Sequence, residues 1–179
     1  LKLNTKDGKV ETVRVDMGEP ILNPKEIPVI SNEEPVKNLV LEADDKKFKF
    51  TCVSMGNPHA ITQVENTDNF DVEKYGKLLE VDKAFPNKTN VEFIQIVDKE
   101  HVKMRVWERG AGETLACGTG ACGTAVACYL NGETGRKVEV ELLGGNLYID
   151  WDEKDNHVYM TGPAVTVFEG ELLETKKEE

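Results

Sequence analysis

The chain has 179 residues, of which 22 are basic and 33 acidic, giving a net charge of −11. This charge argues against general nucleic-acid binding, which needs a basic surface, and any acidic substrate must be attracted by local groups. No apolar run approaches the roughly 20 residues of a membrane-spanning helix, so the composition predicts a soluble globular protein without membrane or nucleic-acid partners.

The cysteines indicate a reducing compartment. Four cysteines, Cys52, Cys117, Cys122 and Cys128, are too few for the disulfide framework of a small secreted protein, and the chain shows no signal peptide. Three of them follow a C-x4-C-x5-C spacing, which differs from the C-x2–4-C pairs of common zinc sites. The histidines are scattered without ligand spacing. We therefore expect free thiols in the cytoplasm and no metal site.

The first predicted element is a β-hairpin over residues 1–17, whose two alternating segments flank a glycine-containing turn at residues 6–9. Four prolines then predict an irregular connector from Gly18 to Pro35. Two strands are expected between Asn38 and Val53, with Asp44-Asp45-Lys46-Lys47 as their turn.

The next stretch predicts loops, strands and one surface helix. MGNPHA, at residues 55–60, carries loop signals, and strand alternation resumes in ITQVEN. Apolar residues at helical spacing predict a short helix over Asp71–Leu79, with Asp68 or Asn69 as its cap. A loop is expected at residues 85–90, followed by strands in VEFIQIVD and HVKMRVWE.

The remaining chain contains a second helix between strands. Small and apolar residues on nearly every face of Thr119–Leu130 predict a helix buried inside the domain, ended by Asn131-Gly132. KVEVELLGGNLYIDWD predicts a hairpin with Gly144-Gly145 at its turn, residues 157–173 one or two strands, and ETKKEE a mobile tail. The fold class expected is α+β, with mostly antiparallel strands around one central buried helix.

Cys117 stands at the predicted start of the buried helix, within Ala-Cys-Gly-Thr-Gly. Backbone N–H groups at a helix start attract anions, and the same field lowers a cysteine pKa toward the thiolate. If the amides of Gly118, Thr119 and Gly120 face outward, they can hold a carboxylate beside the thiolate, which suits proton removal from the adjacent carbon. A small buried hydrophobe is an equally good interpretation of a free cysteine.

Charged and amide side chains accompany this loop. Glu108 and Arg109 have two interpretations. They are either a solvated charge pair at a strand end, or they bind an amino acid, with Arg109 pairing a carboxylate and Glu108 pairing an ammonium group. Asn57 and His59 flank a proline, and Asn90 lies in a second Asn-rich loop. Each is compatible with an ordinary turn, but together the two loops suggest convergence on the cysteine.

MGNPHA, FPNKTNVEF and WERGAGETLACGTGACGTAVA resemble the second half of diaminopimelate epimerases, nearly continuously from Gly56 to Ala127. MTGPAVTVFEGEL resembles that family's final segment. The resemblance implies a cofactor-independent isomerase that interconverts LL- and meso-diaminopimelate for lysine and peptidoglycan synthesis. It also implies two cysteines, one on each face of the α-carbon, of which Cys117 matches the second.

The resemblance implies further roles around the thiol. The side chains expected to hold the substrate are Asn57, Asn90, Glu108 and Arg109. The amides expected to hold its α-carboxylate are those of Gly118 and Thr119. The residues expected to adjust the thiol pKa values are His59 and Glu108.

One feature of the family is missing from this chain. The first cysteine of the family lies in a Cys-Gly-Asn-Gly type of motif, which does not occur here, and Cys52 reads as a strand residue. We therefore expect part of a two-domain protein, in which residues 18–161 form the second domain. The hairpin at 1–17 and a strand with the tail at 162–179 would belong to the missing first domain. Because inversion needs a proton donor on the opposite face, we expect the chain alone to be inactive.

Two other functions stay open. One is a related proline-racemase-like or phenazine-biosynthesis-like isomerase, although Glu108 and Arg109 favour a substrate with two charged ends over proline. The other is a non-catalytic fragment that binds a partner or an amino acid. The partners expected are diaminopimelate, the N-terminal half of the same enzyme and, as a candidate, a second copy of the chain.

Overall fold

The structure is a computed structural model that describes residues 1–172. The predicted mobile tail, residues 174–179, lies outside this part. The strands are β1 (Lys2–Lys6), β2 (Lys9–Asp16), β3 (Leu39–Ala43), β4 (Lys46–Ser54), β5 (Pro58–Gln63), β6 (Asn90–Ile96), β7 (His101–Glu108), β8 (Gly112–Thr114), β9 (Lys137–Leu142), β10 (Gly145–Trp151) and β11 (Val158–Pro163). The helices are α1 (Val72–Glu80) and α2 (Gly118–Leu130).

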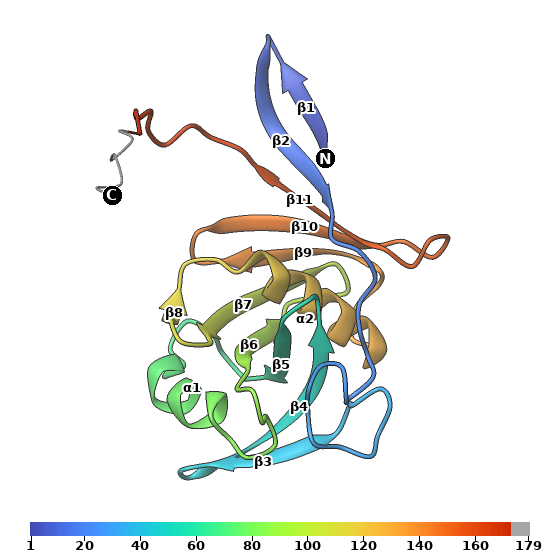
Figure 1. Cartoon of the computed structure of the whole chain (residues 1–179), viewed down its shortest axis with the longest axis vertical. Helices are drawn as coiled ribbons and strands as arrows, with labels where there is room; N and C mark the ends of the chain where they lie inside the picture. The colour runs from blue at the N-terminus through green and yellow to red at the C-terminus, as the bar shows by residue number, and fades with distance from the viewer. Residues whose placement is uncertain (173–179) are drawn as a thin grey trace, which may run out of the picture.

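One hydrogen-bonded sheet contains all of these strands. Its order is β1-β2-β11-β10-β9-β7-β6-β5-β4-β3, with β8 paired to β7 at the side. The pairs β5–β6 and β7–β9 are parallel, and the other pairs are antiparallel. Figure 1 shows the β1–β2 hairpin projecting from the body of the molecule. The prediction of a sheet-rich α+β fold with few helices is confirmed.

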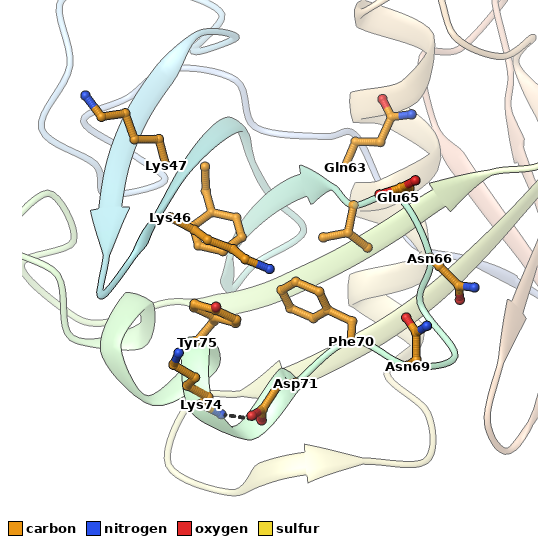
Figure 2. Close-up of a pocket in the computed structure, with 12 residues that line it drawn as sticks. Lys46, Lys47, Gln63, Glu65, Asn66, Asn69, Phe70, Asp71, Lys74 and Tyr75 are labelled. Atoms are coloured by element: carbon orange, nitrogen blue, oxygen red, sulfur yellow. Dashed lines mark hydrogen bonds between the residues drawn. The ribbon is translucent and has the colours of Figure 1, made fainter.

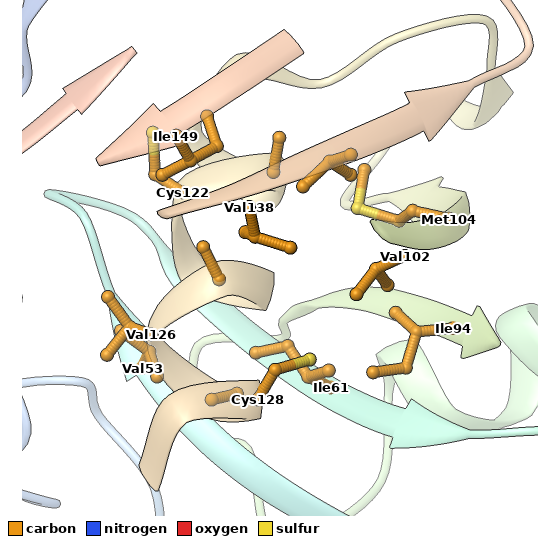
Figure 3. Close-up of a cluster of buried hydrophobic side chains, with 14 of the residues drawn as sticks. Val53, Ile61, Ile94, Val102, Met104, Cys122, Val126, Cys128, Val138 and Ile149 are labelled. Atoms are coloured by element: carbon orange, nitrogen blue, oxygen red, sulfur yellow. The ribbon is translucent and has the colours of Figure 1, made fainter. Parts of the chain in front are cut away.

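Helix α2 is buried, as its composition predicted. Nine consecutive residues, Gly120–Cys128, are buried, and the helix contacts β4, β5, β6, β9, β10 and β11. Figure 3 shows Cys122 and Val126 of α2 within the larger apolar cluster, among strand residues such as Val138 and Ile149. A helix with no polar face is stable in water only when strands cover it in this way.

Strands β4 and β5 are buried on both faces because a second apolar cluster lies behind them, under α1 and β3. Val53 and Ile61 belong to the α2 cluster, whereas their neighbours Cys52 and Ala60 belong to the second one. Side chains alternate between the two faces of a strand. The same alternation turns His59, two residues before Ile61, toward α2.

The cap of α1 differs from the prediction. Asp71, not Asp68 or Asn69, is the N-cap residue, and its Oδ1 accepts a hydrogen bond of 3.0 Å from the Lys74 amide. Figure 2 shows this bond. An N-cap side chain must reach the amide two or three residues along, so only the residue directly before the helix can serve.

Several strand boundaries also differ. β5 begins at Pro58, so His59 and Ala60 lie in a strand rather than in the predicted loop. His59 pairs with Val53 on one side and with Asn90 on the other. The backbone ladder therefore extends through a segment whose Asn-Pro composition favours a turn. Asn90 likewise begins β6 instead of ending a loop.

The hairpin turns differ from the predictions. Ala43 pairs with Lys46, so the turn between β3 and β4 has two residues instead of the expected four. Leu142 pairs with Gly145, so the turn between β9 and β10 is Leu143-Gly144, one residue earlier than expected. Strand β8 was not predicted. The β1–β2 hairpin and the irregular connector are confirmed, with Gly8 at a positive φ of 77° in the first turn.

The C-terminal part of the described chain contains one of the predicted final strands. β11 pairs with both β10 and β2, and residues 164–172 follow without helix or strand. Apolar side chains of this last segment are exposed, including Val165 at 80% and Phe168 at 83%. Within residues 1–172, neither helix is both long and apolar enough to cross a membrane.

Candidate active site

Cys117 is the N-cap residue of α2, with the extended backbone angles φ −139° and ψ 106°. Its carbonyl accepts the first hydrogen bond of the helix, at 2.9 Å from the Ala121 amide. The amides of Gly118, Thr119 and Gly120 precede that bond, and such amides have no acceptor within their own helix. The sulfur thus lies beside a group of backbone donors, as the sequence predicted.

The Cys117 thiol is nevertheless not a thiolate in this chain. Burial, with the negative charge of Glu92 as the second cause, raises its pKa to about 11. The Thr119 hydroxyl, 3.6 Å from the sulfur, and the Gly120 amide lower the pKa, but by less than burial and Glu92 raise it. The predicted lowering is wrong because only 7% of the residue is exposed, and desolvation disfavours the charged form.

A chain of polar contacts leads from this thiol into the core. Asn57 Nδ2 donates to Thr119 Oγ1 at 3.2 Å, and Asn57 Oδ1 lies 3.0 Å from His59 Nε2. His59 is fully buried, and its Nδ1 lies 2.6 Å from Glu92 Oε1. The structure therefore connects Asn57, His59 and Thr119 to Cys117 through side chains alone.

Two glycines let α2 approach this chain. A Cβ on Gly120 would stand 2.8 Å from Glu92 Oε1 and 3.2 Å from Cys117 Sγ. A Cβ on Gly123 would stand 3.4 Å from His59 Cβ. Residues three apart share one face of a helix, so this glycine face lies directly against the polar residues of β5 and β6.

Sequence reasoning missed Glu92. It is fully buried, and its Oε2 accepts no hydrogen bond from residues 1–172. The available signal was a carboxylate between two apolar residues, Val91 and Phe93, in a strand. Alternation places Glu92 on the face opposite those neighbours, toward α2.

Asn90 joins the site through the backbone. Its Nδ2 donates to the Pro58 carbonyl at 2.9 Å, and its Oδ1 accepts from the Arg109 amide at 2.8 Å. Asn90 therefore ties the start of β5 to the loop after β7. These bonds occupy both ends of an amide that is only 4% exposed, so the described structure gives it a clamping role.

Glu108 and Arg109 make separate contacts. Glu108 Oε1 accepts a hydrogen bond of 2.5 Å from Thr114 Oγ1, and the charge of Glu108 contributes to raising the pKa of Cys117. The exposed Arg109 donates from Nη1 to the Asn87 carbonyl at 3.0 Å. Within the described residues the two side chains form no ion pair with each other.

The other cysteines are core residues. Burial raises the pKa of Cys122 and of Cys128 to about 12 and raises that of Cys52 even further. All three are at most 1% exposed. Cys117 is thus the most accessible thiol of residues 1–172. In that part of the chain, no three His, Cys, Asp or Glu side chains are arranged to hold a metal ion.

A cavity of about 770 Å³ lies elsewhere, against the first turn of α1 and the start of β4. Figure 2 shows Lys46, Phe70 and Tyr75 in its wall. None of the candidate site residues lines this cavity. We therefore do not assign the active site to it, and the candidate site stays at Cys117.

The fold is one that an epimerase uses. A solved hydroxyproline epimerase from Agrobacterium vitis matches with a TM-score of 0.66 over 90% of this chain and 52% of that one. The identity is 14%, so the likeness concerns the fold alone. The chain therefore shares the α+β fold of this solved structure.

Sequence comparison gives the family. The family model described as diaminopimelate epimerase matches residues 51–167, and the chain belongs to this family. A diaminopimelate epimerase from Methanococcus maripaludis is 60% identical over 172 residues, which are 96% of this chain and 62% of the relative. One from Acetivibrio thermocellus is 58% identical, with 96% and 61% covered. The chain thus spans about three fifths of the length of these relatives.

Proposed function

We propose that the protein to which this chain belongs is a cofactor-independent diaminopimelate epimerase of the cytoplasm, and that Cys117 is one of its two proton-transferring thiols. The observation that carries this proposal is the thiol at the start of the buried helix α2, inside the segment that matches the family. Family membership favours diaminopimelate over the proline-type and phenazine-type alternatives.

The substrate would be held at both of its charged ends. The free amides of Gly118 and Thr119 suit its reacting α-carboxylate, because helix starts favour anions. The exposed Arg109 suits the distal carboxylate, and the half-buried Glu108 suits an ammonium group. Asn57 would bind from beside the thiol, and Asn90 would hold the start of β5 and the loop after β7 in place.

The chemistry needs a second thiol on the opposite face of the α-carbon. A thiolate there removes the α-proton, and the Cys117 S–H bond then breaks to protonate the carbanion from the other side. The second thiol carries the removed proton, and Cys117 ends as thiolate. The reverse reaction exchanges these roles. Since the other described cysteines are in the core, we infer that the second thiol comes from outside this chain.

We infer a matching division of the molecule. Residues 18–161 would form the second of two similar domains, with strands wrapped around α2. The β1–β2 hairpin and the segment from 162 onward would pack on the first domain. The 56% exposure of Leu3 and the 83% exposure of Phe168 support this, because apolar surface of this kind is usually covered.

Joining this chain to the N-terminal portion of the M. maripaludis relative tests the function. We expect the joined protein to convert LL- into meso-diaminopimelate while leaving L-proline unchanged, and the separate chain to convert neither. Chiral chromatography of the amino acids measures both reactions. Conversion of proline, or turnover by the separate chain at a rate similar to that of the joined protein, would contradict the proposal.

A further inference from the structure

Glu92 is a buried carboxylate for which the proposed reaction has so far no use. It lies on β6, fully buried, with one oxygen against His59 and the other without a partner in residues 1–172. A buried charge with an unsatisfied oxygen is costly. An apolar residue would suit a strand in the core better, so Glu92 calls for an explanation other than stability.

Besides His59, the sulfur of Cys117 lies near Glu92. Glu92 Oε1 and Cys117 Sγ both lie within 3.2 Å of the point that a Cβ on Gly120 would occupy. Any other L-residue at this position would place a Cβ within 3.2 Å of both the carboxylate and the sulfur. Glycine leaves that space free at the first turn of α2.

The two carboxylates around Cys117 act in one direction. Glu92 from β6 and Glu108 from the end of β7 both disfavour a negative charge on the sulfur. His59 from β5 connects to the thiol through Asn57 and Thr119, and its Nδ1 lies 2.6 Å from Glu92 Oε1. Cys122, one turn along α2, is a neutral buried thiol, since its pKa is raised to about 12. Glu92 is the larger of the two acidic influences.

We propose that Glu92 is a positioning residue whose charge, added to the effect of burial, keeps Cys117 protonated, so that this thiol enters the reaction as the proton donor. The donor role rests on the proposed function, whereas the protonation of Cys117 does not. In the donating step the Cys117 S–H bond breaks and a C–H bond forms at the α-carbon, leaving a thiolate whose charge Glu92 opposes. That opposition makes Cys117 a weaker acid in this step, so Glu92 acts by setting the protonation state before the reaction and not by driving the transfer.

The rate at which iodoacetamide alkylates Cys117, followed against pH, tests this in the 179-residue chain without any turnover. Mass spectrometry identifies the modified cysteine. We expect Glu92→Gln to move the pH profile of alkylation to lower pH and to raise the alkylation rate at neutral pH about tenfold. This is the size expected for removing one charge near the sulfur in a partly polar medium. Glu92→Asp keeps the charge and is expected to move the profile much less.

Glu80→Gln is the matched control. Glu80 is also buried and accepts hydrogen bonds from Trp107 and Gly110, but it is absent from the contacts around Cys117. Its variant should leave the Cys117 profile unchanged. An unchanged profile in Glu92→Gln, an equal shift in Glu92→Asp, or the same shift in Glu80→Gln would overturn the proposal.

The experiment also reports unfolding, because an unfolded chain exposes all four cysteines to the reagent. If the Glu92→Gln variant unfolds, the pH profile of Cys117 alkylation in the unvaried chain tests the proposal instead. A Cys117 profile well above that of an ordinary cysteine, whose pKa is about 8.5, is expected, and one at or below it would overturn the proposal. Absence of epimerase turnover in the joined protein would contradict the function and leave the alkylation result standing.

Discussion

At the scale of single residues, the state of Cys117 depends on a balance between burial and hydrogen bonding. Burial and the charge of Glu92 raise its pKa, and the contacts with Thr119 and Gly120 lower it. Thr119 Oγ1 accepts a hydrogen bond from Asn57, so its own proton is free to point at the sulfur. A hydroxyl donor favours the thiolate, because hydrogen bonding to a charged form stabilises it.

Replacing Thr119 by Val removes this hydroxyl at nearly constant volume. We expect the pKa of Cys117 to rise further and its alkylation at neutral pH to slow by roughly 3- to 10-fold, the equivalent of one hydrogen bond to a charged group. Thr124→Val is the control, since Thr124 lies in the same helix but contacts Met104. Faster alkylation in Thr119→Val would contradict the assigned direction of this bond.

Much of the site could be predicted from the sequence at this scale. The motifs around Asn57, His59 and Cys117 indicated residues that the structure connects by hydrogen bonds. The protonation state could not be predicted, because burial comes from strands far away in the sequence. Glu92 was missed because its partner His59 is 33 residues away and only the parallel β5–β6 pairing brings them together.

At the scale of elements, α1 is held against the sheet by a close contact. A Cβ on Gly76 would stand 2.5 Å from Cγ of Trp107, at the end of β7. The same tryptophan donates from Nε1 to Glu80 Oε2 of α1, at 2.7 Å. Burial acts to raise the pKa of Glu80, but the hydrogen bonds from Trp107 and Gly110, together with the charge and hydrogen bond of Lys88, outweigh it, and the net pKa is lowered.

Gly76→Ala is therefore expected to destabilise the chain, although alanine favours helix. Overpacking costs about 1–3 kcal/mol, and the gain in helix propensity is about 1 kcal/mol, so we expect a net loss of up to about 2 kcal/mol. Urea unfolding measures it. Gly135→Ala is the control, because nothing lies within 4 Å of its added Cβ. Stabilisation by Gly76→Ala would show that α1 does not pack on Trp107 in this way.

Elements with strong local signals were predicted, and those that depend on distant pairing were not. The β1–β2 hairpin and α2 follow from alternation and from composition. Strand β8 has three residues and exists only through its pairing with β7. The early start of β5 depends on its ladder with β4 and β6, which overrides the turn preference of Asn57-Pro58.

At the scale of the whole molecule, the four buried thiols link stability to pH. The folded state raises the pKa of every cysteine, to about 11 for Cys117 and about 12 for Cys122 and Cys128. In the unfolded chain thiols ionise near about pH 8.5. The stabilisation is therefore complete below that pH and decreases as the pH rises toward the folded-state values.

We expect the free energy of unfolding to fall between about pH 8 and about pH 10, measured by urea titration in reducing buffer. Cys128→Ala removes one of these thiols and should reduce the slope by up to about 1.4 kcal/mol per pH unit. A flat curve would show that folding does not raise the pKa values of the thiols. The same slope in the variant would show this for Cys128.

The central claim is that Cys117 transfers the proton at the α-carbon of diaminopimelate. Its most direct test is deuterium uptake from D₂O into meso-diaminopimelate formed by the joined protein, with and without Cys117→Ala. We predict that the unvaried protein forms this product with deuterium at the inverted α-carbon, and that Cys117→Ala forms neither product nor label. Inversion with deuterium uptake in Cys117→Ala would remove Cys117 from the mechanism.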